Sequence, residues 1–114
     1  MLHVEIVFLP PEDVFAFEAA ERLTYVHSLS GKFDIDLSLA AMSTALGDRS
    51  MRVHRNWIVS TAHILAMEKD ELGWMLKVGK GLDDIENALC IPVARDKVQR
   101  IREFLLKGTT GLRR

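Results

Sequence analysis

The chain has 114 residues, 48% of them hydrophobic and 27% charged, so one globular domain is expected rather than a disordered or fibrous chain. The unbroken apolar runs, such as Ile6 to Leu9, are too short to cross a membrane, and we expect no secretory signal. A single cysteine, Cys90, excludes an intramolecular disulfide and favours a reducing, cytoplasmic location.

The net charge of −1 conceals an uneven distribution of charged side chains. Residues 1–48 carry eight acidic and two basic side chains, whereas residues 92–114 carry seven basic and two acidic ones. Three arginines, two histidines and no acid lie between Arg49 and Met67. This separation is typical of a surface directed at an anion such as nucleic acid. The alternative is ordinary solvated surface with a frayed basic C-terminus.

The first third of the chain is rich in β-forming residues, and a helix follows it. Leu39, Met42 and Leu46 share one helical face, which predicts a helix over residues 37–46. Asp36 or Ser38 is the expected N-cap of this helix, and Gly47 follows its last periodic residue. The strands predicted before the helix are His3–Phe8, Val14–Ala19 with Phe15 and Phe17 on one face, Thr24–Leu29 and Lys32–Asp36, with a hairpin turn at Ser30-Gly31-Lys32.

The second half repeats this order of strands followed by a helix. The last helix is predicted from Arg95 to Lys107, and the tail Thr109–Arg114 is expected to be loose. Val98, Ile101 and Leu105 line its apolar face. The strands predicted before it are Arg52–His54 continuing into Trp57–Val59, Ile64–Glu68, Leu72–Val78 and Asn87–Ile91. Mostly antiparallel strands with two short helices are therefore expected.

No catalytic or metal-binding motif is recognisable in the sequence. The four histidines and Cys90 lack the short spacings that arrange metal ligands, so ordinary structural or surface roles are favoured over a metal site. There is no phosphate-binding glycine loop and no nucleophile elbow. Cys90 lies in an apolar segment and is expected to be a small buried residue. We therefore expect neither an enzyme nor a bound cofactor.

Four separated segments resemble the LytTR family of bacterial DNA-binding domains. The stretch RSMRVHRNWIVS, from Arg49 to Ser60, is similar to the family pattern F-x-R-x-H-R-S-[aromatic]-[aliphatic]-V-N. The residues that match it are Arg52, His54, Arg55, Trp57, Ile58 and Val59. The other three segments are Glu18-Ala19-Ala20 followed by Tyr25-Val26, Leu37–Leu46 followed by Gly47-Asp48-Arg49, and Ile91–Arg95, which resembles the family's [LI]-P-V-S-R.

The resemblance implies both a fold and a function. It implies an elongated arrangement of small antiparallel β-sheets with one short internal helix and one C-terminal helix, over residues 1–108, with residues 109–114 as a flexible basic tail. Family members are transcription regulators or response-regulator output domains. Their loops enter successive major grooves of imperfect direct repeats in double-stranded DNA. A sensor or receiver domain, in cis or in trans, is an implied partner.

The family's contact positions can be transferred one by one. In the loop before Tyr25 the base-reading candidate is Thr24, with Arg22 nearby, and the other two candidates are Arg55 and Arg95. The arginine fork suits this role because it bonds guanine O6 and N7 together. The implied phosphate contacts are Arg52, Asn56, Lys97 and Arg100.

Three residues depart from the family pattern. Asn56 replaces a serine, Ser60 replaces an asparagine, and Ala94 replaces the serine before Arg95, which removes a helix N-cap. Arg95 at a helix N-terminus is at the unfavourable end of the helix dipole, which favours a functional role.

Structural alternatives exist for three kinds of residue. Arg52 could pair with Asp48 or another acid and hold a loop. His54 is favoured as a structural hydrogen-bonding residue over a base reader, and the two tryptophans as core residues.

Two functional hypotheses follow from the sequence. The first is a sequence-specific DNA-binding domain that is monomeric when free and binds DNA as two copies. The second is a β-rich protein-interaction or ligand-sensing module whose basic face binds an acidic partner. The salt dependence of binding separates them, because displacement of counterions from several phosphates makes DNA affinity fall steeply with salt.

Overall fold

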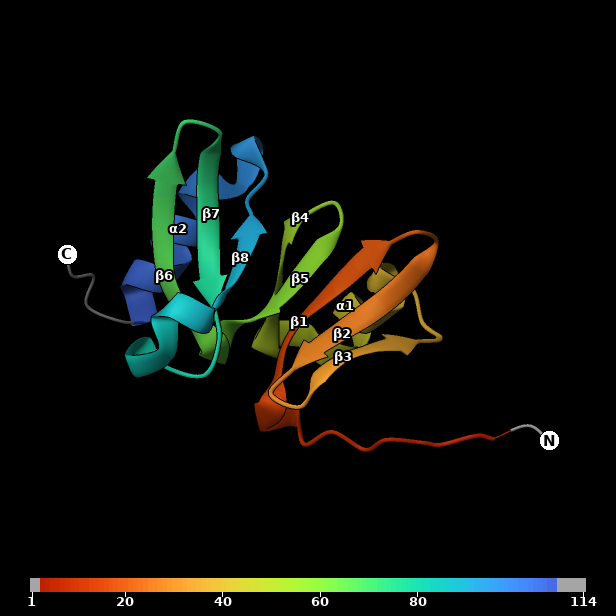
Figure 1. The fold of residues 1–114 in the computed structure, drawn as a ribbon. Helices are drawn as coiled ribbons and strands as arrows, with labels where there is room; N and C mark the ends of the chain where they lie inside the picture. Colours follow the sequence, from red (N-terminus) through yellow and green to blue (C-terminus); the bar gives the residue numbers. More distant parts are fainter. Residues whose placement is uncertain (1–2, 109–114) are drawn as a thin grey trace.

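The computed structural model describes residues 3–108, whose strands form two antiparallel sheets lying side by side (Figure 1). The strand order is β3-β2-β1-β5-β4 in the five-stranded sheet and β6-β7-β8 in the three-stranded sheet. The shape is elongated, with principal extents of 54 × 30 × 28 Å. The strands are β1 (Val14–Ala20), β2 (Leu23–Ser28), β3 (Gly31–Ile35), β4 (Ser50–His54), β5 (Trp57–Ser60), β6 (Ile64–Asp70), β7 (Gly73–Val78) and β8 (Leu89–Pro92).

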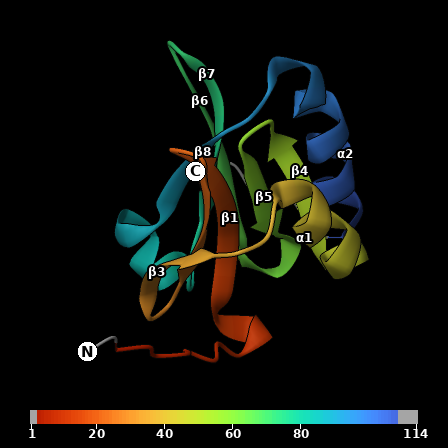
Figure 2. The same ribbon diagram turned by 90° about the vertical axis from the view of Figure 1, so that its right-hand side faces the viewer.

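Two α-helices, α1 (Leu39–Leu46) and α2 (Val98–Gly108), lie on the same side of the strands (Figure 2). Ser38 is the N-cap of α1, where its Oγ accepts a hydrogen bond from the Ala41 N–H at 3.2 Å. The expected mostly β architecture, with one short internal helix and one C-terminal helix, is confirmed. The short 3₁₀ segments are η1 (Pro11–Asp13), η2 (Gly47–Arg49), η3 (Thr61–His63), η4 (Leu82–Asn87) and η5 (Arg95–Lys97).

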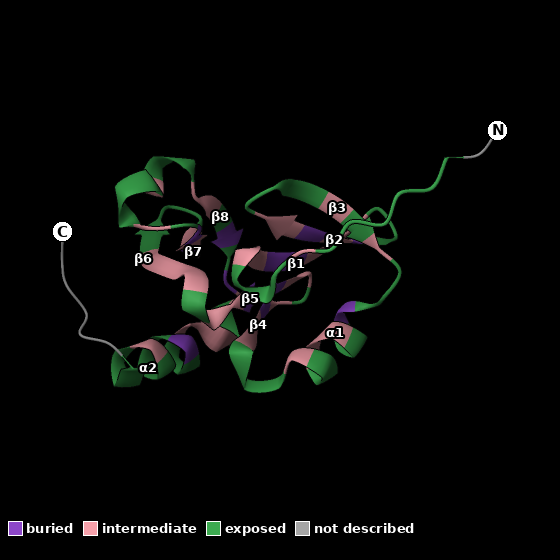
Figure 3. Ribbon diagram, turned by 90° about the horizontal axis from the view of Figure 1, so that it is seen from below, coloured by how far each residue is buried: buried purple, intermediate pink, exposed green. Residues whose placement is uncertain are grey.

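The central strands β1 and β5 are buried on both faces. Ala16 and Val59 belong to a core shared with the three-stranded sheet and α2, whereas Phe17 and Ile58 belong to a second core under α1. Burial on both faces explains why these strands are continuous apolar runs rather than alternating ones. In the first core Ile101 anchors α2 and is 1% exposed. The outward faces of both helices are exposed (Figure 3).

The strand expected at His3–Phe8 is wrong. These residues belong to no sheet, and Val4 and Phe8 are 80% and 86% exposed. The neighbouring strand β1 already pairs with β2 on one side and β5 on the other, so it has no free edge for this segment. An apolar alternating pattern cannot form a strand unless a free edge is available to pair with it.

Three smaller expectations also need correction. Cys90 is exposed, because β8 is an edge strand and alternate residues on it face outward while Ile91 is fully buried. Phe15 and Phe17 contact different cores, because a register shift between Val14 and Ala16 interrupts the alternation in β1. The last helix begins with the 3₁₀ segment η5, and α2 starts only at Val98. The tail expected at Thr109–Arg114 lies outside the described residues.

Candidate nucleic-acid interface

Four connections between elements gather along one edge of the molecule, which we call the loop edge. It consists of the β1–β2 turn (residues 21–22), the β4–β5 turn (residues 55–56), the β6–β7 turn (residues 71–72) and η5. In Figure 1 the β6–β7 turn, η5 and the β4–β5 turn lie along the upper side, and the β1–β2 turn lies lower, at the right-hand end, although all four come from distant parts of the sequence. In an antiparallel sheet the chain reverses direction at each turn, so successive turns alternate between two edges and each edge collects every second turn.

Backbone hydrogen bonds connect these turns to one another. The Ala19 N–H donates to the Asn56 carbonyl oxygen at 2.8 Å and joins the end of β1 to the β4–β5 turn. The Ala94 N–H donates to the Val53 carbonyl oxygen at 2.8 Å, and the Val93 N–H to that of Trp74 at 3.1 Å. The segment leading to η5 is therefore held between the end of β4 and the start of β7.

The β4–β5 turn exposes Arg55 and is held by its neighbours. The guanidinium of Arg52 donates from Nε to the His54 carbonyl oxygen at 3.2 Å, and from a terminal nitrogen to the Arg55 carbonyl oxygen. The ring Nδ1 of His54 accepts a hydrogen bond from the Asn56 N–H at 3.1 Å. The structural roles considered for Arg52 and His54 are thus present, with backbone carbonyls rather than an acid as the partners of Arg52.

Arg95 is the first residue of η5 and is exposed. Ala94 occupies the N-cap position and makes no side-chain cap bond, as expected from the loss of the family's serine. Arg95 and Arg55 line one cavity of about 490 Å³, whose other walls come mainly from β7 and β8. Two arginines that are far apart in sequence therefore face the same space on the loop edge.

At the β1–β2 turn, the structure distinguishes the two base-reading candidates, Arg22 and Thr24. Arg22 is exposed and has a positive φ of 69°, and Glu21 beside it has a φ of 53°. Thr24 does not lie in a loop as expected: it is within β2, 7% exposed, and paired with Ala19 and Ile35. The short side chain of Thr24 is buried within the five-stranded sheet and does not extend toward a DNA groove. Arg22 is therefore the side chain of this turn that is available for contact.

The phosphate candidates occupy different environments. Arg100 is exposed on α2, whereas Lys97 and Asn56 are half-buried. Lys97 Nζ donates to the Arg52 carbonyl oxygen at 3.3 Å, which adds a link between η5 and β4. The loop edge also carries acids, Glu21 and Glu71 among them, so its charge is mixed and its arginines are set among carboxylates.

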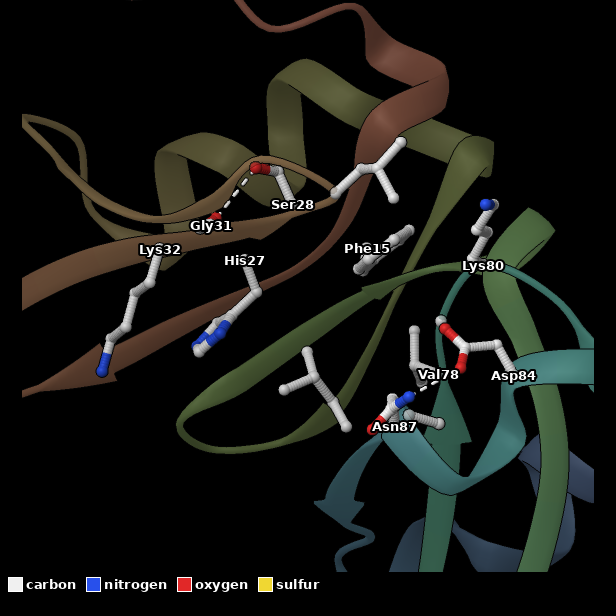
Figure 4. A pocket seen from close by; sticks show the side chains of 13 residues that line it. Phe15, His27, Ser28, Gly31, Lys32, Val78, Lys80, Asp84 and Asn87 are labelled. Atoms are coloured by element: carbon white, nitrogen blue, oxygen red, sulfur yellow. Dashed lines mark hydrogen bonds between the residues drawn. The ribbon is translucent and has the colours of Figure 1, made fainter.

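A second cavity, of about 340 Å³, lies away from the loop edge (Figure 4). Phe15 and His27 line it from the five-stranded sheet, and Asp84 and Asn87 from η4. The Asn87 amide donates to the Asp84 carboxylate at 2.7 Å across its wall. None of the candidate contact residues lines this cavity.

Residues 3–108 contain neither a candidate metal-binding cluster nor a membrane-spanning helix. No cluster of three or more histidine, cysteine, aspartate or glutamate side chains there could hold a metal ion. No helix in that part of the chain is long and apolar enough to cross a membrane.

Comparison with known proteins identifies the family. The family model described as the LytTr DNA-binding domain matches residues 4–106. A similar solved structure is the LytTr DNA-binding domain of a methyl-accepting/DNA response regulator from Bacillus cereus, with a TM-score of 0.70 and 26% identity over 85% of this chain and 84% of that one. The chain belongs to the LytTr DNA-binding domain family.

Two curated relatives are transcription regulators by name. The CO-responsive transcriptional regulator RcoM of Rhodospirillum rubrum is 33% identical over 86% of this chain and 40% of its own length. The positive alginate biosynthesis regulatory protein of Pseudomonas aeruginosa is 31% identical over 88% of this chain and 39% of its own length. The chain therefore spans about two fifths of each relative.

Sequence reasoning did not identify one part of the loop edge. Leu72 was predicted to begin a strand, and neither it nor Glu71 was assigned a contact role, whereas the structure places both in the exposed β6–β7 turn. The position of Leu72 in the same cavity as Arg55 and Arg95 depends on the packing of the two sheets. A hairpin signal in the sequence indicates a turn but not its neighbours.

Proposed function

We propose that this chain binds double-stranded DNA sequence-specifically in the regulation of transcription, with the loop edge facing the DNA. The observation that carries the proposal is the pair Arg55 and Arg95, both exposed and both lining one cavity of this edge. A guanidinium that reaches the major groove can bond guanine O6 and N7 at once. Membership of a DNA-binding family supports the same conclusion.

The candidate residues of the loop edge and of the neighbouring β4 and α2 divide into three roles. Arg22, Arg55 and Arg95 are exposed at three separate turns and read bases. Arg100, Lys97 and Asn56 contact phosphates and fix the register. Arg52 positions the β4–β5 turn through its bonds to the carbonyl oxygens of His54 and Arg55.

The proposed DNA site consists of imperfect direct repeats. Successive major grooves on one face of DNA are one helical turn, about 34 Å, apart. The loop edge presents separate turns from both sheets, which supports contact between one chain and two successive grooves. One copy of the chain occupies each repeat, and the free chain is a monomer.

Regulation is proposed to come from outside this domain. The relatives are more than twice as long as the matched part, which supports a sensor or receiver domain acting in cis or in trans. The proposed place of action is the bacterial cytoplasm, where the chromosome is accessible. The proposed activity needs no catalytic group and no cofactor.

The test is selection of DNA from a random pool, followed by titration of the selected and a scrambled duplex over a series of salt concentrations. We expect preferential binding of the selected duplex and a linear fall of log affinity with log salt. Equal binding of both duplexes, or none, overturns the proposal. Binding of an acidic protein instead of DNA would favour the interaction-module hypothesis.

A further inference from the structure

The β6–β7 turn exposes a leucine at a fixed position. Leu72 is 95% exposed, the highest value among the large hydrophobic side chains of the described residues. One carboxylate oxygen of Asp70 accepts from the Leu72 N–H at 2.8 Å and from the Gly73 N–H at 3.2 Å. Gly73 has a φ of 131°, which only glycine adopts readily. The turn is thus held by its own side chain and backbone, so Leu72 projects in a defined direction.

Leu72 shares its surroundings with the two arginines. It lines the same cavity as Arg55 and Arg95. Single exposed leucines are common on protein surfaces and need no explanation by themselves. Leu82 and Leu106, which are 63% and 53% exposed, line neither this cavity nor the loop edge. The position of Leu72 beside two candidate base-reading side chains distinguishes it from these residues.

We propose that Leu72 is a specificity-determining residue that contacts the C5-methyl group of a thymine next to a guanine read by Arg55 or Arg95. This inference rests on the proposed function. The thymine methyl is the apolar group in the pattern that bases present in the major groove, and apolar side chains recognise it by contact. Burial of Leu72 against that methyl removes from water an apolar surface that the free protein exposes almost completely.

Glu71 disfavours contact between this turn and the DNA backbone. It is exposed immediately before Leu72. Its carboxylate is repelled by phosphates at close range, whereas the leucine side chain gains nothing from them. Contact of this turn with the DNA is therefore restricted to the space between the phosphate rows, where the edges of the bases are accessible.

The experiment replaces each thymine of the selected duplex, one at a time, by deoxyuridine. This change removes the methyl group and leaves the hydrogen-bonding groups intact. For the unmodified chain we expect one or two positions at which affinity falls about fourfold, the value for losing one buried methyl-sized group. At those positions Leu72→Ala should bind the thymine and deoxyuridine duplexes equally. Leu82→Ala is the matched control and should keep the difference.

The outcomes separate this inference from the proposed function. If the unmodified chain binds selected DNA but shows no thymine preference, or if Leu72→Ala keeps it, the role of Leu72 is overturned and DNA binding stands. If no duplex is preferred at all, both are overturned. Because Leu72 is 95% exposed, its substitution should leave thermal unfolding unchanged, and Leu72→Asn provides a second variant with the same expected loss.

Discussion

Arg52 donates from its guanidinium to the main-chain carbonyl oxygen of Arg55, so one arginine holds the turn that exposes the other. The same guanidinium bonds the carbonyl oxygen of His54, and Lys97 bonds that of Arg52 itself. These bonds join strand β4, the β4–β5 turn and η5 into one unit. The geometry of the candidate interface therefore depends on residues that need not touch DNA.

Arg52→Ala should reduce specific DNA binding without changing its salt dependence. The loss of two donors frees the turn, so Arg55 has to be ordered during binding, at an entropic cost of about 1–2 kcal/mol per backbone residue. Arg52→Lys should not restore binding, because an ammonium lacks the fork that spans two carbonyl oxygens. Titration at several salt concentrations is the measurement. A slope reduced by about one unit would instead identify Arg52 as a phosphate contact.

Arg55→Ala and Arg95→Ala should each weaken specific binding by about 1–3 kcal/mol and relax preference at one base position. The reason is the loss of a two-point contact with a single guanine. The matched control is Arg49→Ala, an exposed arginine before β4, at the end of this strand opposite Arg55. Competition titrations against single-base variants of the site measure both effects. Equal losses on specific and random DNA would contradict base reading.

Arg22→Gly should stabilise the fold and weaken DNA binding. Arg22 has a φ of 69°, and relief of about 1–2 kcal/mol of left-handed strain exceeds the entropy of about 0.5–1 kcal/mol that glycine loses on folding. Glu21→Gly is the control, because it relieves strain at a φ of 53° and removes no cation. Urea unfolding and DNA titration are the two measurements. Retained base preference in Arg22→Gly would exclude Arg22 from base reading.

Arg100→Ala and Lys97→Ala should weaken binding to all DNA sequences alike. Each should lower the slope of log affinity against log salt by about one unit, because one fewer phosphate is neutralised. Lys80→Ala is the control: this lysine is exposed and lines the cavity away from the loop edge, so the slope should not change. A selective loss on one base sequence would move Arg100 or Lys97 to the base-reading group.

The free chain should sediment as a monomer at tens of micromolar and bind two-repeat DNA more tightly than one-repeat DNA. Ile101 faces the core, so the apolar face of α2 is already occupied within one chain. Copies on direct repeats meet head to tail, which requires no self-complementary surface, and adjacent binding raises their local concentration. A stable dimer without DNA would show that the exposed side of α2, which includes Phe104, is an interface.

The local sequence pattern was sufficient to predict an element where that element depends mainly on its own residues. The stripe of Leu39, Met42 and Leu46 predicts α1, and Ser38 is the cap that this helix uses. The same reasoning failed at His3–Phe8, where the alternation is present but the next strand in the chain, β1, is already paired on both sides. It also placed Thr24 in a loop, whereas β2 starts one residue before it and the residue is buried.

The sequence by itself determined the family and the order of most elements, and it named Arg55 and Arg95 as candidates, because motifs such as Arg49–Ser60 and Ile91–Arg95 are read directly from residue types. Only the tertiary structure decided which side chains share the loop edge. Arg55, Arg95 and Leu72 line one cavity because two sheets pack together and backbone bonds hold η5 between β4 and β7. These contacts depend on pairing between segments that are distant in the sequence, about which local periodicity carries no information.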